Sequence, residues 1–245
     1  KNFFWDNLWG GDVFDVMPDP EDANWVYAMS QGGSVGRYNT ATGEQTSIQP
    51  PSPDAKTLMR FNWNAAIAQD PFDKKTIYFG SQFLHKSTNK GAAWKLISPD
   101  LTTNDSAKID QTNNGGLSID ITGAENHCTI IAIAPSSVQK DLIWIGTDDG
   151  NVQFTSNGGA TWNNVTANIT GLPKGAWIPQ IRTSTYNANE VFVVANNYRQ
   201  GDFAPYVFRT TDQGKTWTNI LSAAKVTGYA LSVIQDIVEP NLFFV

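Results

Sequence analysis

The chain has 245 residues, of which 16% are charged and 12% aromatic, including nine Trp. Its 23 acidic and 17 basic residues give a formal net charge of −6, which argues against nucleic acid as a partner because phosphate binding needs clustered Lys and Arg. Cys128 is the single cysteine, so the chain cannot hold a disulfide framework. It lies in a β-rich run, where we expect a buried, unreactive thiol.

Membrane, metal and cofactor functions are not indicated. No apolar run approaches the roughly 20 residues of a membrane helix, so we expect no membrane span. His85 and His127 lie in different parts of the chain without metal-ligand spacing, and no phosphate-binding or dinucleotide motif occurs. We therefore expect no metal and no cofactor. Few Lys, many Asn, Thr and Gly, and the acidic balance are typical of a secreted, periplasmic or cell-surface protein.

Pairs of short β-branched or aromatic segments follow one another along the whole chain, separated by turn residues. Each pair predicts the first two strands of a repeated unit. The pairs are 14–17 with 25–29, 65–68 with 75–80, 129–134 with 142–146, 178–183 with 190–194, and 230–234 with 241–245.

The same turn recurs downstream of three of these pairs, at 87–94, 155–162 and 210–217. Each copy has a hydroxyl residue, then Asp or Asn two positions later, Gly two positions after that, and finally Trp. Asp or Asn can hydrogen-bond the backbone of its own turn, and Gly accepts a positive φ. We call these segments the repeat turns and expect structural roles for Asn89, Gly91, Trp94, Asn157, Gly159, Trp162, Asp212, Gly214 and Trp217.

With the repeat turn joining a third strand to a fourth, each unit has four strands. Four-stranded antiparallel units in series are the blades of a β-propeller. We predict an all-β fold in which residues 1–245 form one propeller segment of about four and a half blades. The blades are expected at 11–47, 58–100, 124–168, 176–222 and 228–245. An open arc exposes sheet faces, so we expect further blades of a longer chain, or another chain, to complete the ring.

The repeat turn resembles the Asp-box, SxDxGxTW, of bacterial-neuraminidase-repeat propellers such as sialidases. The copy at 210–217 keeps the acid, whereas the other two carry Asn, and Ala93 replaces the usual Thr. Segments 10–12, 27–33, 60–64, 97–105 and 146–150 are similar to large secreted bacterial proteins with sortilin-like Asp-box propellers. Those proteins are usually labelled glycosyl hydrolases because of their repeats. This resemblance implies a propeller in a longer parent chain, but it implies no reaction.

In such a propeller, the repeat turns lie at one end of the blades, and the blade-to-blade connections and second-to-third-strand loops lie at the other. The long insertions, 96–126, 163–175 and 196–206, belong to the second end, which predicts a binding surface there. Aromatic and amide side chains enter the first strands from this end and suit sugar rings and hydroxyls. Alternatively, Trp63 and Trp177 only wedge adjacent blades. The candidate ligand-binding residues are Trp63, Asn64, His127, Trp177, Tyr198, Arg199 and Tyr229.

Catalysis of glycoside hydrolysis needs two carboxyl groups about 5 to 10 Å apart, one with a raised pKa. Glu125 could form such a pair with Asp12, Asp148 or Asp149, although residues 148–151 also make a good tight turn. A sialidase-type site would need converging Arg side chains, and Arg37 and Arg209 are expected near the repeat turns instead.

Three functions therefore remain open. The first is a non-catalytic or accessory segment that binds glycan or an extracellular protein through the loop-rich end. The second is a glycoside hydrolase whose acid and base come partly from blades outside this segment. The third is a sortilin-like propeller that binds peptides.

Overall fold

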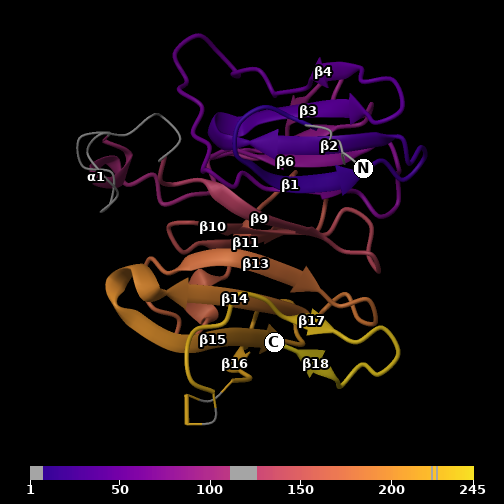
Figure 1. The fold of residues 1–245 in the computed structure, drawn as a ribbon. Helices are drawn as coiled ribbons and strands as arrows, with labels where there is room; N and C mark the ends of the chain where they lie inside the picture. Colours follow the sequence, from indigo (N-terminus) through magenta and orange to yellow (C-terminus); the bar gives the residue numbers. More distant parts are fainter. Residues whose placement is uncertain (1–7, 111–125, 222, 225) are drawn as a thin grey trace, which may run out of the picture.

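The computed structural model describes residues 8–110, 126–221, 223–224 and 226–245. Within them the chain forms four antiparallel sheets of four strands and a final two-stranded sheet, each built from consecutive strands. The sheets succeed one another from the indigo N-terminal sheet to the yellow C-terminal pair (Figure 1). The prediction of an all-β partial propeller is confirmed.

The first two sheets contain the strands β1 (Val13–Pro18), β2 (Trp25–Ser30), β3 (Ser34–Asn39) and β4 (Gln45–Ser47), then β5 (Ile67–Gln69), β6 (Ile77–Gly80), β7 (Leu84–Ser87) and β8 (Lys95–Leu96). The next two contain β9 (Ile130–Pro135), β10 (Ile143–Thr147), β11 (Val152–Thr155) and β12 (Asn163–Asn164), then β13 (Trp177–Thr183), β14 (Val191–Asn197), β15 (Asp202–Thr210) and β16 (Thr218–Asn219).

Helical structure in the described residues is limited to the short segments η1 (Gln31–Gly33), α1 (Ser106–Ile109), η2 (Thr166–Asn168) and η3 (Tyr198–Gln200). None of these helices is long and apolar enough to cross a membrane.

The last sheet pairs β17 (Ile234–Gln235) with β18 (Phe243–Phe244). Its first strand therefore begins later than the expected 230–234. The N–H of Val233, directly before β17, donates to Oε1 of the Gln180 side chain at 2.7 Å and is therefore not part of a strand ladder.

The hydrophobic core is divided into layers between successive sheets, as face-to-face packing of blades requires. One layer joins Tyr27 and Met29 of the first sheet to Phe61 and Phe79 of the second. Equivalent layers lie between the second and third, third and fourth, and fourth and fifth sheets. Several aromatic residues of the chain, among them Trp144 and Phe192, lie in these layers.

Two glycines allow these sheets to approach closely. A Cβ at Gly80 would lie 2.9 Å from Cβ of Ile130, and one at Gly146 would lie 2.5 Å from Cγ2 of Ile178. Real side chains cannot tolerate such contacts without displacement. Gly80 and Gly146 therefore let the first strand of the following sheet pack against the end of β6 and β10.

The three repeat turns share one hydrogen-bond network. In the first, Oγ of Ser87 accepts from the N–H of Gly91 at 2.8 Å, and Oδ1 of Asn89 accepts from the N–H of Ala93 at 2.8 Å. The equivalent hydrogen bonds in the second and third turns all have donor–acceptor distances of 2.9 Å. Because the network needs only the Oδ1 acceptor, Asn serves as well as Asp.

Two repeat turns also attach their sheet to the preceding one. Nε1 of Trp94 donates to the carbonyl of Ile48 at 2.7 Å, and Nε1 of Trp162 donates to that of Ile97 at 3.0 Å. In the third turn, Nε1 of Trp217 instead donates to the carbonyl of Gly214 at 3.1 Å. The hydrogen bonds of Trp94 and Trp162 attach the second sheet to the first and the third sheet to the second.

Candidate functional site

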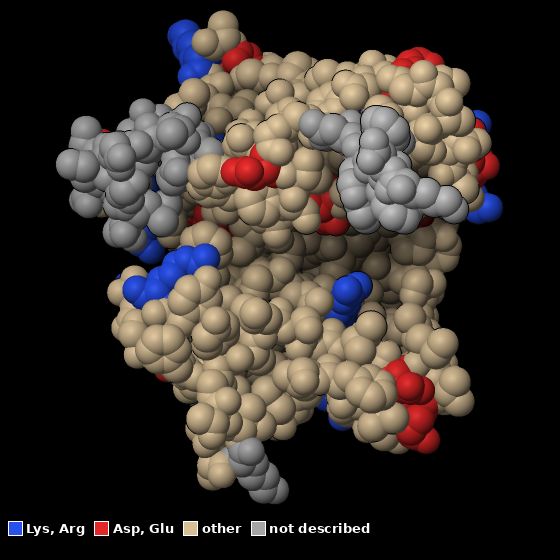
Figure 2. Space-filling view, viewed as in Figure 1, with Lys and Arg blue, Asp and Glu red and all other residues tan. Residues whose placement is uncertain are grey.

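A cavity of about 450 Å³ opens where the first strands begin, at the end of the sheets opposite the repeat turns. Its lining residues come from the first strands of the sheets, from the segments that precede them, and from the end of β14 with η3. In the space-filling view the surface is hollowed between the N-terminal and C-terminal sheets, and most of the surrounding side chains are uncharged (Figure 2). The volume lies within the roughly 300–1,000 Å³ of ordinary ligand pockets.

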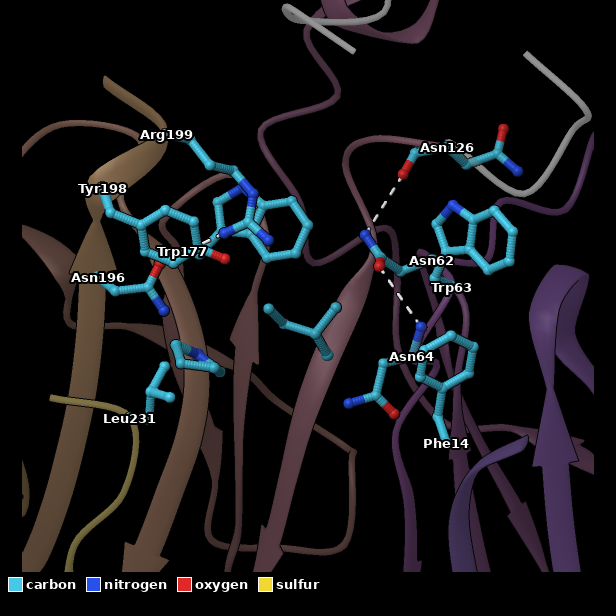
Figure 3. Close-up of a pocket in the computed structure, with 12 residues that line it drawn as sticks. Phe14, Asn62, Trp63, Asn64, Asn126, Trp177, Asn196, Tyr198, Arg199 and Leu231 are labelled. Atoms are coloured by element: carbon cyan, nitrogen blue, oxygen red, sulfur yellow. Dashed lines mark hydrogen bonds between the residues drawn. The ribbon is translucent and has the colours of Figure 1, made fainter. Parts of the chain in front are cut away.

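One wall of the cavity carries Phe14, Trp63 and Asn64 (Figure 3). The rings of Phe14 and Trp63 meet edge to face, with their centroids 6.0 Å apart. Phe14 belongs to β1 and is 46% exposed, whereas Trp63 precedes β5 in the next sheet. Trp63 therefore packs between two adjacent sheets, which is the wedge role considered in the sequence analysis. It also lines the cavity.

The opposite wall carries Trp177, Tyr198 and Arg199 (Figure 3). The guanidinium carbon of Arg199 lies 3.5 Å from the centroid of the Trp177 ring and 4.5 Å from that of Tyr198. Trp177 opens β13 and pairs with Asn196 near the end of β14, and η3 follows directly. Partial burial lowers the pKa of Arg199, but a guanidinium remains charged at any ordinary pH.

Amide side chains add hydrogen-bonding groups to these aromatic walls. Nδ2 of Asn62 donates to the carbonyl of Asn126 at 3.4 Å and to Oδ2 of Asp148 at 2.8 Å. Oδ1 of Asn196 accepts from Nη1 of Arg199 at 3.4 Å. Asn62, Asn64, Asn126 and Asn196 all line the cavity, so it combines apolar ring faces with amide donors and acceptors.

Behind this lining, Asp148 is completely buried. Its carboxyl group accepts from the N–H and Oγ1 of Thr129 at 2.8 and 2.6 Å, in addition to Asn62. Burial, together with the neighbouring Asp149, raises the pKa of Asp148 to about 7. Asp148 therefore holds the segments that precede β5 and β9 in position, and it does not touch the cavity.

His127 and Cys128 are also buried behind the cavity. Nδ1 of His127 lies 4.0 Å from Oδ1 of Asp148, and burial lowers the pKa of His127 to about 4. Burial raises the pKa of the Cys128 thiol to about 12, so it stays protonated and unreactive, as the sequence predicted. The Cys128 carbonyl accepts from Nε of Arg60 at 3.2 Å, and Nη2 of Arg60 contacts Oδ2 of Asp100 at 2.6 Å.

A second cavity of about 1150 Å³ lies at the same end, lined by Asp149, Lys108 and Lys174 among others. Both carboxylate oxygens of Asp149 are occupied. Oδ2 accepts from the N–H and Oγ1 of Thr103, each at 2.7 Å, and Oδ1 accepts from Oγ1 of Thr147 at 2.5 Å. This carboxylate joins the 147–151 loop to the connection that follows β8.

The structure brings together five of the residues expected to bind a ligand, since Trp63, Asn64, Trp177, Tyr198 and Arg199 line one cavity. Two others lie one contact behind it. Tyr229 packs on Tyr198 with ring centroids 4.8 Å apart. The rings of His127 and Trp177 meet edge to face, with their centroids 6.5 Å apart.

The carboxylate pairs considered for catalysis all include Glu125, so the described residues do not test them. Asp12 lies on an exposed segment, where its N–H donates to Oε1 of Gln31 at 2.8 Å, and Asp149 faces the second cavity. Glu125 lies outside the described residues. Over the described part of the chain, no group of three or more His, Cys, Asp or Glu side chains is arranged to hold a metal ion.

Sequence reasoning missed the apolar lining residues Phe14, Ile131, Pro179 and Leu231. Phe14, Ile131 and Pro179 lie in first strands and Leu231 precedes one. Alternation along those strands could have identified the positions that face the cavity.

Comparisons with known proteins support the fold. Neither a protein-family model nor a curated protein sequence matches the chain. Among solved structures it is similar to a GH74 xyloglucanase from Xanthomonas campestris, with a TM-score of 0.56 and 15% identity over 86% of this chain and 30% of that one. A Bacteroides thetaiotaomicron protein of unknown function gives a TM-score of 0.53 and 12% identity over 88% and 45%. The chain thus spans less than half the length of these structures.

Proposed function

We propose that this chain is a non-catalytic, glycan-binding segment of a secreted Asp-box propeller protein, and that a sugar binds between Trp63 and Trp177. The observation that carries the proposal is the composition of the cavity, which pairs aromatic walls with Asn62, Asn64, Asn126 and Asn196. Aromatic faces suit the apolar faces of sugar rings, and amides offer both donors and acceptors to hydroxyl groups.

The described carboxylates do not favour catalysis. No Asp or Glu among the described residues lines the cavity, whereas glycoside hydrolysis needs two carboxyl groups beside the scissile bond. Asp148 has the raised pKa of a general acid, but it is fully buried and bound by Asn62 and Thr129. A binding role therefore accounts for the site better than a hydrolytic one.

We also propose that further blades of a parent chain, or another chain, complete the ring. Apolar side chains are exposed on both outer sheets, with Val16 on β1 and Ile234 and Phe244 on β17 and β18. Exposed apolar patches of this kind mark interaction surfaces. The composition, together with the resemblance to secreted proteins, supports an extracellular or periplasmic location.

Screening the chain on a glycan array, followed by titration calorimetry of the bound glycans, tests the proposed function. Xyloglucan oligosaccharides belong on the array because a similar structure is a xyloglucanase. Trp63→Ala should weaken binding, whereas Phe72→Ala should not, because Phe72 is an exposed aromatic residue that does not line the cavity. Binding that Trp63→Ala leaves intact would contradict the proposal.

The fold similarity to a glycoside hydrolase keeps hydrolysis as a second candidate. A parent protein that cleaves a polysaccharide, and loses this activity on Glu125→Gln but not on Asp212→Asn, would replace the binding proposal with the enzymatic one. Capture of peptides without any glycan signal would favour the sortilin-like alternative.

A further inference from the structure

We propose that the cavity selects acidic glycans, in which the carboxylate of a uronic acid is bound by Arg199. The inference rests on the proposed glycan-binding function and specifies the class of sugar. It depends on three features of Arg199: the lack of a carboxylate partner among the described residues, its fixed orientation, and the absence of competing negative charge in the described lining.

Arg199 differs in its partners from three of the other four arginines of the chain. Arg37, Arg60 and Arg209 contact the carboxylates of Asp19, Asp100 and Glu190 at 3.0, 2.6 and 2.5 Å. Within the described residues, Arg199 has no carboxylate partner, and its one hydrogen bond, to Oδ1 of Asn196, is long at 3.4 Å. Its charge is therefore available to a ligand.

The neighbouring rings hold the Arg199 guanidinium in place. Its carbon lies 3.5 Å from the centroid of Trp177 and 4.5 Å from that of Tyr198, and Tyr198 is itself packed on Tyr229. Contact with ring faces leaves the N–H groups at the edges of the guanidinium available, and these groups match the two oxygens of a carboxylate. A group that is already oriented loses less entropy when it binds.

The charge distribution around the cavity favours an anion. Arg199 is the one Lys, Arg, Asp or Glu residue among the described lining residues. Asp148, which lies behind the lining, is fully buried and accepts a hydrogen bond from Asn62. Since the whole chain carries a net charge of −6, an acidic polymer has no general attraction to it, and binding would depend on this local cation.

Trp63 supplies the second half of the recognition. It lies on the wall opposite Arg199 (Figure 3). A pyranose ring that stacks on Trp63 can direct the carboxylate at its C5 position across the cavity to Arg199. A neutral sugar would make the stacking contact and leave the guanidinium without its strongest partner.

The test compares oligosaccharides of galacturonate and of glucuronate with their uncharged methyl esters by titration calorimetry. We expect at least one acid to bind about 10- to 100-fold more tightly than its ester, as a charge-assisted hydrogen bond predicts. Arg199→Gln should remove this difference, and Arg199→Lys should restore only part of it because Lys lacks the planar fork. Arg182→Gln, at an exposed arginine outside this cavity, should leave it unchanged.

The outcomes separate this inference from the proposed function. If neutral glycans bind as tightly as acids, and Trp63→Ala abolishes both, the site binds glycans but the inference about Arg199 is wrong. If no glycan binds and peptides with a free C-terminal carboxylate do, the inference and the proposed function both fail. An acid preference that survives Arg199→Gln also overturns the inference.

Discussion

The guanidinium of Arg199 rests on the ring of Trp177, with 3.5 Å between its central carbon and the ring centroid. These residues are brought together by strand pairing. Trp177 is the first residue of β13 and pairs with Asn196 of β14, and Asn196 lies three residues before Arg199 in the chain. The contact turns a flexible side chain into a fixed part of the cavity wall. Both the sugar site and its charge therefore depend on Trp177.

Substitution of Trp177 should affect binding more than any other change in that wall. Trp177→Ala removes a ring face and the platform of Arg199, so binding should weaken by ~1–3 kcal/mol. Trp177→Phe keeps a smaller platform and should retain part of the affinity. Titration calorimetry measures both effects, and urea unfolding of each variant shows whether the fold is intact. Equal affinity of Trp177→Ala and the wild type would contradict this role.

Removal of the acid in the third repeat turn should lower stability without changing affinity. Asp212 accepts from Oγ1 of Thr210 at 2.8 Å and from the N–H and Oγ1 of Thr216 at 2.9 and 2.6 Å. Asp212→Ala should lower the free energy of unfolding by ~1 kcal/mol. Asp212→Asn is the matched control, because Asn89 and Asn157 make the same turn. A larger loss with Asn than with Ala would refute the shared network.

Close packing of a repeat turn on the preceding sheet can be tested with two glycines. Gly159 and Gly171 have φ angles of 99° and 87°, so Ala is strained at both by roughly 1–2 kcal/mol. A Cβ at Gly159 would also lie 2.3 Å from the carbonyl oxygen of Ile97, whereas one at Gly171 meets nothing within 4 Å. Gly159→Ala should therefore cost ~1–3 kcal/mol more than Gly171→Ala in chemical unfolding. Equal costs would argue against the close contact.

The buried carboxyl group of Asp148 should make stability depend on pH. Its pKa is about 7 in the folded protein against an ordinary value of 3.8, so between these values the folded state binds the extra proton. Its contribution therefore favours folding at low pH and is lost as the pH rises from about 4 to about 7. His127, with a pKa of about 4, is largely neutral across most of this range.

Urea unfolding of the wild type and Asp148→Asn at several pH values isolates this effect. The stability of the wild type relative to the variant should fall as the pH rises from about 4 to about 7. A difference that stays constant, or that grows with pH, would show that Asp148 is ionised in the folded protein.

The sequence predicted the fold well because local signals repeat. Three turns with the same hydroxyl, Asx, Gly and Trp positions, each preceded by β-branched strands, indicate blades without any knowledge of long-range contacts. The start of the fifth unit was less predictable, since β17 begins at Ile234 and the preceding Val233 binds the side chain of Gln180. That contact joins residues 53 positions apart, and a local pattern does not contain it.

The candidate site was predictable only in part. Trp63, Trp177 and Tyr198 could be assigned to one end of the blades because loop position follows from strand order. The sequence alone did not show that Arg199 rests on Trp177 or that Asp148 ties Asn62 to Thr129, because both contacts depend on packing between separate segments. The apolar side of the cavity was missed because Phe14 and Leu231 look like ordinary strand residues.

A crystal structure of the protein with the tightest-binding oligosaccharide from the glycan array is the most direct test of the central claim. The account predicts electron density for a sugar between Trp63 and Trp177, with a ring against one of them and hydrogen bonds to the surrounding Asn side chains. Density for the sugar at the repeat turns, or in the cavity lined by Lys108 and Lys174 with the first cavity empty, would contradict it.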